Sequence, residues 1–340
     1  ATLTTDPTTT SIYNAGGHGT NVLSTIAGYE SGKIIGTAYH ASFALAQTEE
    51  SNHELIVEEA NWLRGAEWAD SLGTDILSSS LGYSTFDNPQ HNHAYSDLAG
   101  KSTLVSKAAA WAASKGIICT ISAGNEGANN WKFITAPADA DSILTVGSVN
   151  ALGTLSAFSS TGPSFDGRVK PDVVAMGSST SVGFIDGTIG TSNGTSFSAP
   201  LIAGLAAGLI QTFPRHRAQQ IRQAILKSGN QFTAPDMLRG FGIPTYDKAS
   251  ELMELILGNE PSASNISVFP NPVSPGSPLR IKIPFEKAAV DMLNSAGEIV
   301  HSFHLDESES SIYLGPFVSG KYYFRFTAES TVQTIPVLVL

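Results

Sequence analysis

The segment Ala199–Ile210 constrains the fold of this chain most, because it is apolar nearly all round. A helix without a polar face must be buried, so the segment predicts a helix covered by other elements on every side. Pro200 suits the first turn of that helix, where a missing backbone N–H costs little. Ser196, two residues after a glycine, would then lie at the N-terminal end, where free N–H groups and the helix dipole favour negative charge.

The rest of residues 10–250 alternates between helix-like and strand-like segments, which is typical of a parallel sheet covered by helices on both faces. A composition of 41% hydrophobic and 14% charged residues indicates a globular chain with a large core. The expected helices are Val57–Leu72 and Ser102–Lys115, and the expected strands are Ile34–Gln47, Ile117–Ser122 and Ser142–Val149.

Three short motifs place chemically useful side chains beside glycines. His18 stands in GGHGTNV (residues 16–22), Asn125 in ISAGN (121–125) and Ser196 in NGTSFSAP (193–200). Singly, each has a plain structural explanation: a packed or capping histidine, a turn asparagine and a helix-capping serine. Functionally, an amide donor and a helix N-terminus beside a serine could stabilise the oxyanion of an acyl transfer.

Together and in this order, the motifs resemble those of the subtilisin-like serine proteases, the subtilases, over roughly residues 10–250. The resemblance implies a peptidase domain at residues 1–257 with an α/β, three-layer subtilisin-like fold and a parallel central sheet. It also implies the roles of the site residues. Ser196 would be the nucleophile and His18 the general base and then acid, while Asn125 and the backbone N–H of Ser196 would be oxyanion donors.

Two further segments resemble the walls of the substrate groove in this family. One is Ser80, Leu81 and Gly82 at the end of an apolar strand, and the other is Ala123 and Gly124. An extended peptide would add as a strand and place one side chain in a pocket between them. Because Gly124 leaves room there, we expect a large apolar side chain in that pocket.

The aspartate of the family's triad has no clear counterpart here. It precedes the histidine by some thirty residues or more, whereas only 17 residues precede His18. Asp6 is the only acid among them and lies before a proline in a Thr-rich segment that is typical of a loop. The expectation is that the chain begins inside the catalytic domain, with Asp6 as the other candidate for the third member of the triad.

Charge and composition exclude several other kinds of site. The net charge of −11 argues against nucleic acid or an anionic membrane as a partner, and no apolar run is long enough to span a bilayer. The single Cys119 excludes an internal disulfide and is expected to pack as a small hydrophobic residue. We expect no cofactor and no metal site. One acidic cluster resembles no calcium loop and is expected to be solvated at a loop and helix start. It comprises Glu49, Glu50, Glu54, Glu58 and Glu59.

The composition changes after Leu257. Residues 258–264 (GNEPSAS) are typical of a linker, and short strands separated by turns in residues 265–340 predict a small antiparallel β-sandwich. This tail resembles the C-terminal sorting domain of the type IX secretion system of Bacteroidetes, in VFPNP (268–272), AGEIV (296–300) and SGKYY (319–323). The resemblance implies secretion or surface display by a Gram-negative, Bacteroidetes-like bacterium, with the secretion machinery as a partner. The alternative is an accessory sandwich that binds a surface or carbohydrate, since the last strand lacks the expected basic residue.

The sequence therefore predicts a secreted serine endopeptidase that acts on proteins or peptides through an acyl-enzyme on Ser196. One alternative is a pseudoprotease that keeps the groove without turnover; the presence of Ser196, His18 and Asn125 argues against it. The other is an esterase that uses the same nucleophile, but the chain lacks the Gly-x-Ser-x-Gly pattern around Ser196.

Overall fold

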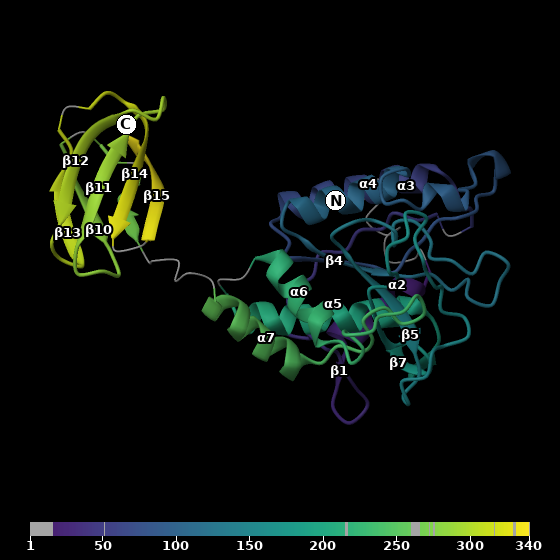
Figure 1. Ribbon diagram of the computed structural model, residues 1–340. Helices are drawn as coiled ribbons and strands as arrows, with labels where there is room; N and C mark the ends of the chain where they lie inside the picture. Colours follow the sequence, from purple (N-terminus) through teal and green to yellow (C-terminus); the bar gives the residue numbers. More distant parts are fainter. Residues whose placement is uncertain are drawn as a thin grey trace. The chain divides into compact units, whose positions relative to one another are not determined.

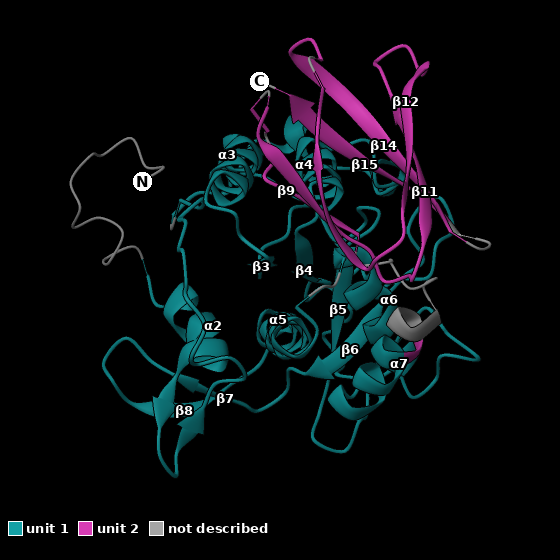
Figure 2. Ribbon diagram, turned by 90° about the vertical axis from the view of Figure 1, so that its left-hand side faces the viewer, with its two compact units in different colours: residues 1–254 teal, residues 255–340 magenta. Residues whose placement is uncertain are grey.

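The computed structural model describes residues 16–50, 52–214, 217–259, 266–271, 273–274, 276–315, 317–328 and 331–339. The chain divides into two compact units, one ending at Glu254 and the other running from Leu255 to the C-terminus (Figure 2). Among the described residues, no helix combines the length and the apolar character needed to cross a membrane.

A four-stranded parallel sheet forms the centre of the first unit, in the order β3 (Ile76–Ser79), β4 (Ile118–Ser122), β5 (Leu144–Val149), β6 (Val173–Met176). Helices α3 (Val57–Ser71) and α4 (Leu104–Ser114) lie on one side of the sheet, and α5 (Thr195–Thr212) lies on the other (Figures 1 and 2). The expected three-layer α/β architecture with a parallel central sheet is therefore confirmed. The predicted helices 57–72 and 102–115 and the predicted strands 117–122 and 142–149 match these elements to within two residues.

Helix α5 is the buried helix that the apolar run predicted. It packs across all four strands of the parallel sheet, and Ala199, Ala206 and Leu209 are fully buried. The helix begins at Thr195, however, so the expectation that Pro200 occupies its first turn is wrong: Pro200 lies inside the helix. The sequence pattern located the apolar face but not the start, because the first four residues of the helix are more polar.

The remaining elements of this unit are helices and two-stranded sheets, and its last helix runs past the unit boundary at Glu254. Helix α2 (His18–Ala27) is followed by a hairpin of β1 (Tyr29–Glu30) and β2 (Ile34–Ile35), and β7 (Thr180–Gly183) pairs with β8 (Ile189–Ser192). Two short 3-10 helices, η1 (Pro89–His91) and η2 (Tyr95–Asp97), precede α4, while α6 (Ala218–Ser228) and α7 (Tyr246–Asn259) follow α5.

The expected strand Ile34–Gln47 is wrong beyond its first two residues. The chain reverses at Gly32, whose φ of 79° suits a glycine, and only β2 pairs with β1. No strand of the described residues pairs with the segment after Ile35, and the apolar side chains of Phe43 and Leu45 are exposed there. Apolar residues alone do not make a strand when no neighbouring edge accepts their backbone hydrogen bonds.

The second unit is the expected antiparallel sandwich. One sheet has the order β13 (Glu309–Tyr313), β10 (Pro278–Lys282), β9 (Ser267–Phe269), and the other has the order β12 (Ile299–Leu305), β11 (Ala288–Leu293), β14 (Gly320–Ala328), β15 (Thr331–Val339). Alternate side chains of the two sheets share one core, in which Ile281, Val290 and Phe324 are fully buried. Helix α7 reaches Asn259, so the first two residues of the expected linker are helical.

Candidate active site

Ser196 is the second residue of α5 and is 7% exposed. Gly194 precedes the helix with a φ of 152°, a conformation that side chains disfavour, and this glycine turns the chain sharply into the helix. The backbone N–H of Ser196 lies in the first helical turn, where no carbonyl of the same helix can accept it. The nucleophile predicted from the sequence is thus held at a helix N-terminus beside a free amide.

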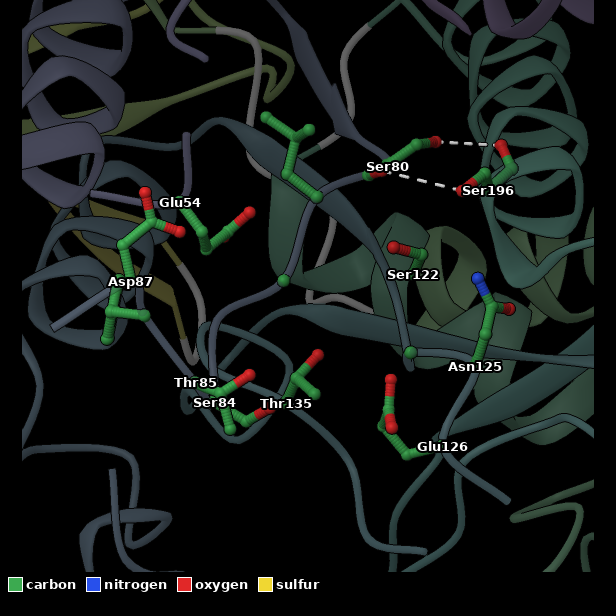
Figure 3. A pocket seen from close by; sticks show the side chains of 14 residues that line it. Glu54, Ser80, Ser84, Thr85, Asp87, Ser122, Asn125, Glu126, Thr135 and Ser196 are labelled. Atoms are coloured by element: carbon green, nitrogen blue, oxygen red, sulfur yellow. Dashed lines mark hydrogen bonds between the residues drawn. The ribbon is translucent and has the colours of Figure 1, made fainter. Parts of the chain in front are cut away.

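Pro200 changes the hydrogen bonding of Ser196. In a regular helix the N–H of residue 200 would donate to the carbonyl of residue 196, but proline has no N–H. The Ser196 carbonyl instead accepts a hydrogen bond from the Ser80 hydroxyl at 2.7 Å. The Ser196 hydroxyl in turn donates to the carbonyl of Ser80 at 3.5 Å (Figure 3). Ser196 and the segment after β3 are therefore joined directly.

Asn125 follows β4, and its side-chain amide is fixed by the start of α5. Its Oδ1 accepts the backbone N–H of Thr195 at 2.9 Å and lies 3.1 Å from the Thr195 hydroxyl. With the amide oxygen held in this way, the amide nitrogen is directed toward the side of Ser196 (Figure 3). Asn125 and the Ser196 N–H are therefore the candidates for the pair of donors that an oxyanion requires.

Thr195 holds the side chain of Asn125, which the sequence reasoning missed. It is fully buried, and besides Asn125 its hydroxyl contacts the backbone of Gly124, accepting from the N–H at 3.2 Å. Its place directly before Ser196 was visible in the sequence. Its function was not, because its partners lie 70 residues away along the chain.

His18 is the first residue of α2, and its ring centroid lies 6.3 Å from that of Phe197, the residue after Ser196. Desolvation by the surrounding protein lowers the pKa of His18, which favours the neutral imidazole that a general base requires. Within the described part of the chain, His18 has neither a hydrogen bond to Ser196 nor one to a carboxylate. Asp6 lies outside the described residues.

The predicted groove segments meet at the carboxyl ends of two neighbouring parallel strands, since β3 and β4 pair in register. A cavity of about 440 Å³ lies there, and Asn125 and Ser196 border it (Figure 3). Ser80, Leu81, Gly82 and Gly124 line this cavity as expected. Ala123 does not, because it is fully buried and its carbonyl accepts the N–H of Thr135.

The rest of the cavity lining is polar except for Phe86, and three acids border it. The lining residues not yet named are Glu54, Ser84, Thr85, Phe86, Asp87, Ser122, Glu126 and Thr135.

The acidic cluster is less solvated than expected. Glu58 is 0% exposed, and its carboxylate accepts the backbone N–H groups of Glu50 and Leu55. Glu59 is also buried, and it binds His93 and the N–H of Val105. Both carboxylates can be buried because fixed donors replace their water. The expectation of a solvated helix start is therefore wrong for these two residues.

Cys119 is buried as predicted, and burial raises its pKa to about 12. A thiol with that pKa remains protonated near neutral pH and is not a nucleophile. Ser196 is thus the candidate nucleophile of this unit.

A buried serine at a helix N-terminus, beside a fixed amide and a cavity, is the arrangement that the sequence motifs led us to expect in a subtilisin-like α/β fold. The chain belongs to the subtilase family, whose family model matches residues 3–243. Subtilisin E of Bacillus subtilis (strain 168) is 31% identical over 234 residues, which cover 66% of this chain and 55% of that protein. The chain therefore spans about half the length of that relative. A subtilisin of Bacillus pumilus is 30% identical over 72% of this chain and 82% of that protein.

A solved structure shares the fold. The prenylagaramide maturation protease PagA superimposes with a TM-score of 0.58 at 23% identity, over 69% of this chain and 82% of that one. The subtilisin-like fold expected from the sequence motifs is thereby confirmed.

Proposed function

We propose that this chain carries the catalytic machinery of a secreted serine endopeptidase. The observation that carries the proposal is the amide of Asn125, which Thr195 anchors so that its nitrogen faces the side of Ser196. A donor fixed by its oxygen, beside a free helix N–H, suits a charge that develops only during acyl transfer.

The proposed reaction has two stages. The Ser196 oxygen attacks the carbonyl carbon of the scissile peptide, its proton passes to His18, and the carbonyl oxygen becomes an oxyanion bound by Asn125 and the Ser196 N–H. The C–N bond then breaks, and the leaving amine takes the proton from His18. In the second stage His18 accepts a proton from water, the hydroxide attacks the acyl-enzyme, and Ser196 recovers its proton. The result is a carboxylic acid and an amine, with no change in the enzyme.

A fluorophosphonate probe tests the proposal directly, because it reacts only with an activated serine. We expect labelling at Ser196, confirmed by mass spectrometry of the modified peptide, and none in Ser196→Ala. A chain that binds peptides in the groove but is never labelled would be a peptide-binding pseudoprotease, and the endopeptidase proposal would fail.

We further propose that the second unit serves export as a type IX sorting domain. Its compactness and its sandwich fold support a separable module. The AGEIV motif falls on the turn from β11 to β12, where Asn294 Oδ1 accepts the N–H groups of Ala296 and Glu298. Gly297 in this turn has a φ of 83°, which explains the glycine of the motif.

A further inference from the structure

The cavity beside Ser196 is negatively charged. Glu54, Asp87 and Glu126 all line it, and the lining within the described residues includes no lysine, arginine or histidine (Figure 3). Asp87 accepts a hydrogen bond from the exposed His53 at 2.9 Å, and Glu126 accepts one from Asn129 at 2.6 Å. The carboxylate of Glu54 has no hydrogen bond or ion pair among the described residues, although its side chain is partly buried.

The groups around Glu54 make its charge costly. Its carboxylate oxygens lie within 4.8 Å of those of Glu49, from the preceding segment, and Glu58, from α3. Asp87 faces it from the segment after β3 and forms its hydrogen bond with the ring of His53. Burial makes the largest contribution to the pKa of Glu54, and repulsion from Glu58, Glu49 and Asp87 adds to it. Together they raise that pKa to about 7. A cation that entered the cavity would be attracted by Glu54 and would favour its ionised form.

Thr135 provides an independent indication that the occupant is polar. It is 4% exposed, and its hydroxyl has no hydrogen-bond partner within the described structure. The hydroxyl lies between the two walls of the groove, since a Cβ added to Gly82 would stand 2.1 Å from it and one added to Gly124 would stand 2.9 Å from it. A buried hydroxyl is costly to leave unpaired, so an occupant that hydrogen-bonds fits this cavity better than an apolar one.

We propose that the cavity selects substrates with a positively charged side chain, lysine or arginine, and that Glu54 with Asp87 determines this specificity. The proposal rests on the proposed peptidase function and replaces the expectation of a large apolar side chain. A volume of about 440 Å³ accommodates a long basic side chain. Carboxylates that face a cavity without cations of their own select the opposite charge and disfavour an acidic one.

The test compares matched peptides that differ at one position and carry lysine, arginine, leucine or glutamate in turn at each of the four residues before the scissile bond. At one of these positions we expect kcat/KM for lysine or arginine to exceed that for leucine at least tenfold, and glutamate to be the poorest. Glu54→Gln should lower the lysine-to-leucine ratio about tenfold, and Glu54→Lys should invert the preference toward glutamate. Glu67→Gln removes the same charge from an exposed position of α3 that does not line the cavity, and it should leave the ratio unchanged.

The ratio should also rise with pH through about 7 in the parent chain and stay level in Glu54→Gln. Because the general base acts on both peptides, its titration cancels in the ratio. A preference for leucine at every position, or an unchanged ratio in Glu54→Gln, overturns the proposal. A third result would also overturn it: a parent chain that shows no lysine preference but binds calcium, with the binding lost in Glu54→Gln. That result would assign the acids to a metal.

Peptide binding to Ser196→Ala, measured by fluorescence anisotropy, separates this proposal from the catalytic one. Selective binding of lysine peptides that Glu54→Gln weakens would support the charged cavity even if the parent chain hydrolyses nothing. Hydrolysis of leucine and lysine peptides at equal rates would instead support the peptidase and refute the specificity.

Discussion

Replacing Thr195 by valine tests whether the oxyanion donor is held by the start of α5. Valine keeps the shape of the buried threonine but loses the hydroxyl that lies 3.1 Å from Asn125 Oδ1 and accepts the N–H of Gly124, while the backbone N–H of residue 195 at 2.9 Å remains. One neutral hydrogen bond contributes about 1 kcal/mol net, and a loss of that size at the transition state lowers kcat about fivefold. KM should change little, because the amide acts mainly when charge develops.

The assay is kcat at saturating peptide for Thr195→Val, Asn125→Ala and the double variant. Asn125→Ala should lose about 10²–10³-fold, the range known for the corresponding donor in subtilisin itself. Because Thr195 acts through Asn125, Thr195→Val should cost nothing further in the Asn125→Ala background. Thr195→Ser keeps the hydroxyl and should retain kcat, which makes it the matched control. A fivefold loss that persists without Asn125, or one that falls on KM alone, would refute the reasoning.

Three further predictions concern catalysis and export. Ser196→Ala and His18→Ala should each lower kcat by at least about 10⁴-fold, as members of subtilisin's own triad do, and the losses should not add; a Ser196→Ala chain that keeps most of its activity contradicts the assignment. Burial lowers the pKa of His18 below its usual 6.5, and the neutral form is the base, so the acidic limb of the kcat/KM profile should be centred below pH 6.5. That limb should be absent from the residual activity of His18→Ala, and a limb centred above pH 6.5 argues against His18 as the base. Deleting residues from about 262 onward should block export in the native host while refolded chain retains peptidase activity; normal export of the deletion variant would favour the accessory-module alternative.

Local patterns in the sequence predicted the elements that are recognisable from their own residues alone. The apolar run of α5, the strand before Asn125 and the glycines beside each motif all follow from spacing and residue type. The parallel direction of the strands followed from the alternation of helix-like and strand-like segments, because two parallel strands need a crossover connection, usually a helix.

Features that depend on a distant partner could not be read from the sequence. Glu59 is buried because His93 and the N–H of Val105 lie against it, 34 and 46 residues further along the chain. Thr195 acquires its function from Asn125 in the same way. The helix start at Thr195 was missed because its mostly polar first turn shows no repeat of apolar residues at helical spacing.

The proline inside α5 has a consequence for engineering. Removing a proline from the interior of a helix is an obvious route to a more stable protein, since the new N–H completes the helical ladder. At Pro200 that N–H would compete for the carbonyl of Ser196, which the Ser80 hydroxyl now occupies. A design that ranks substitutions by helix stability alone would select Pro200→Ala, and it would loosen the link between the peptide groove and the nucleophile in exchange for a better helix.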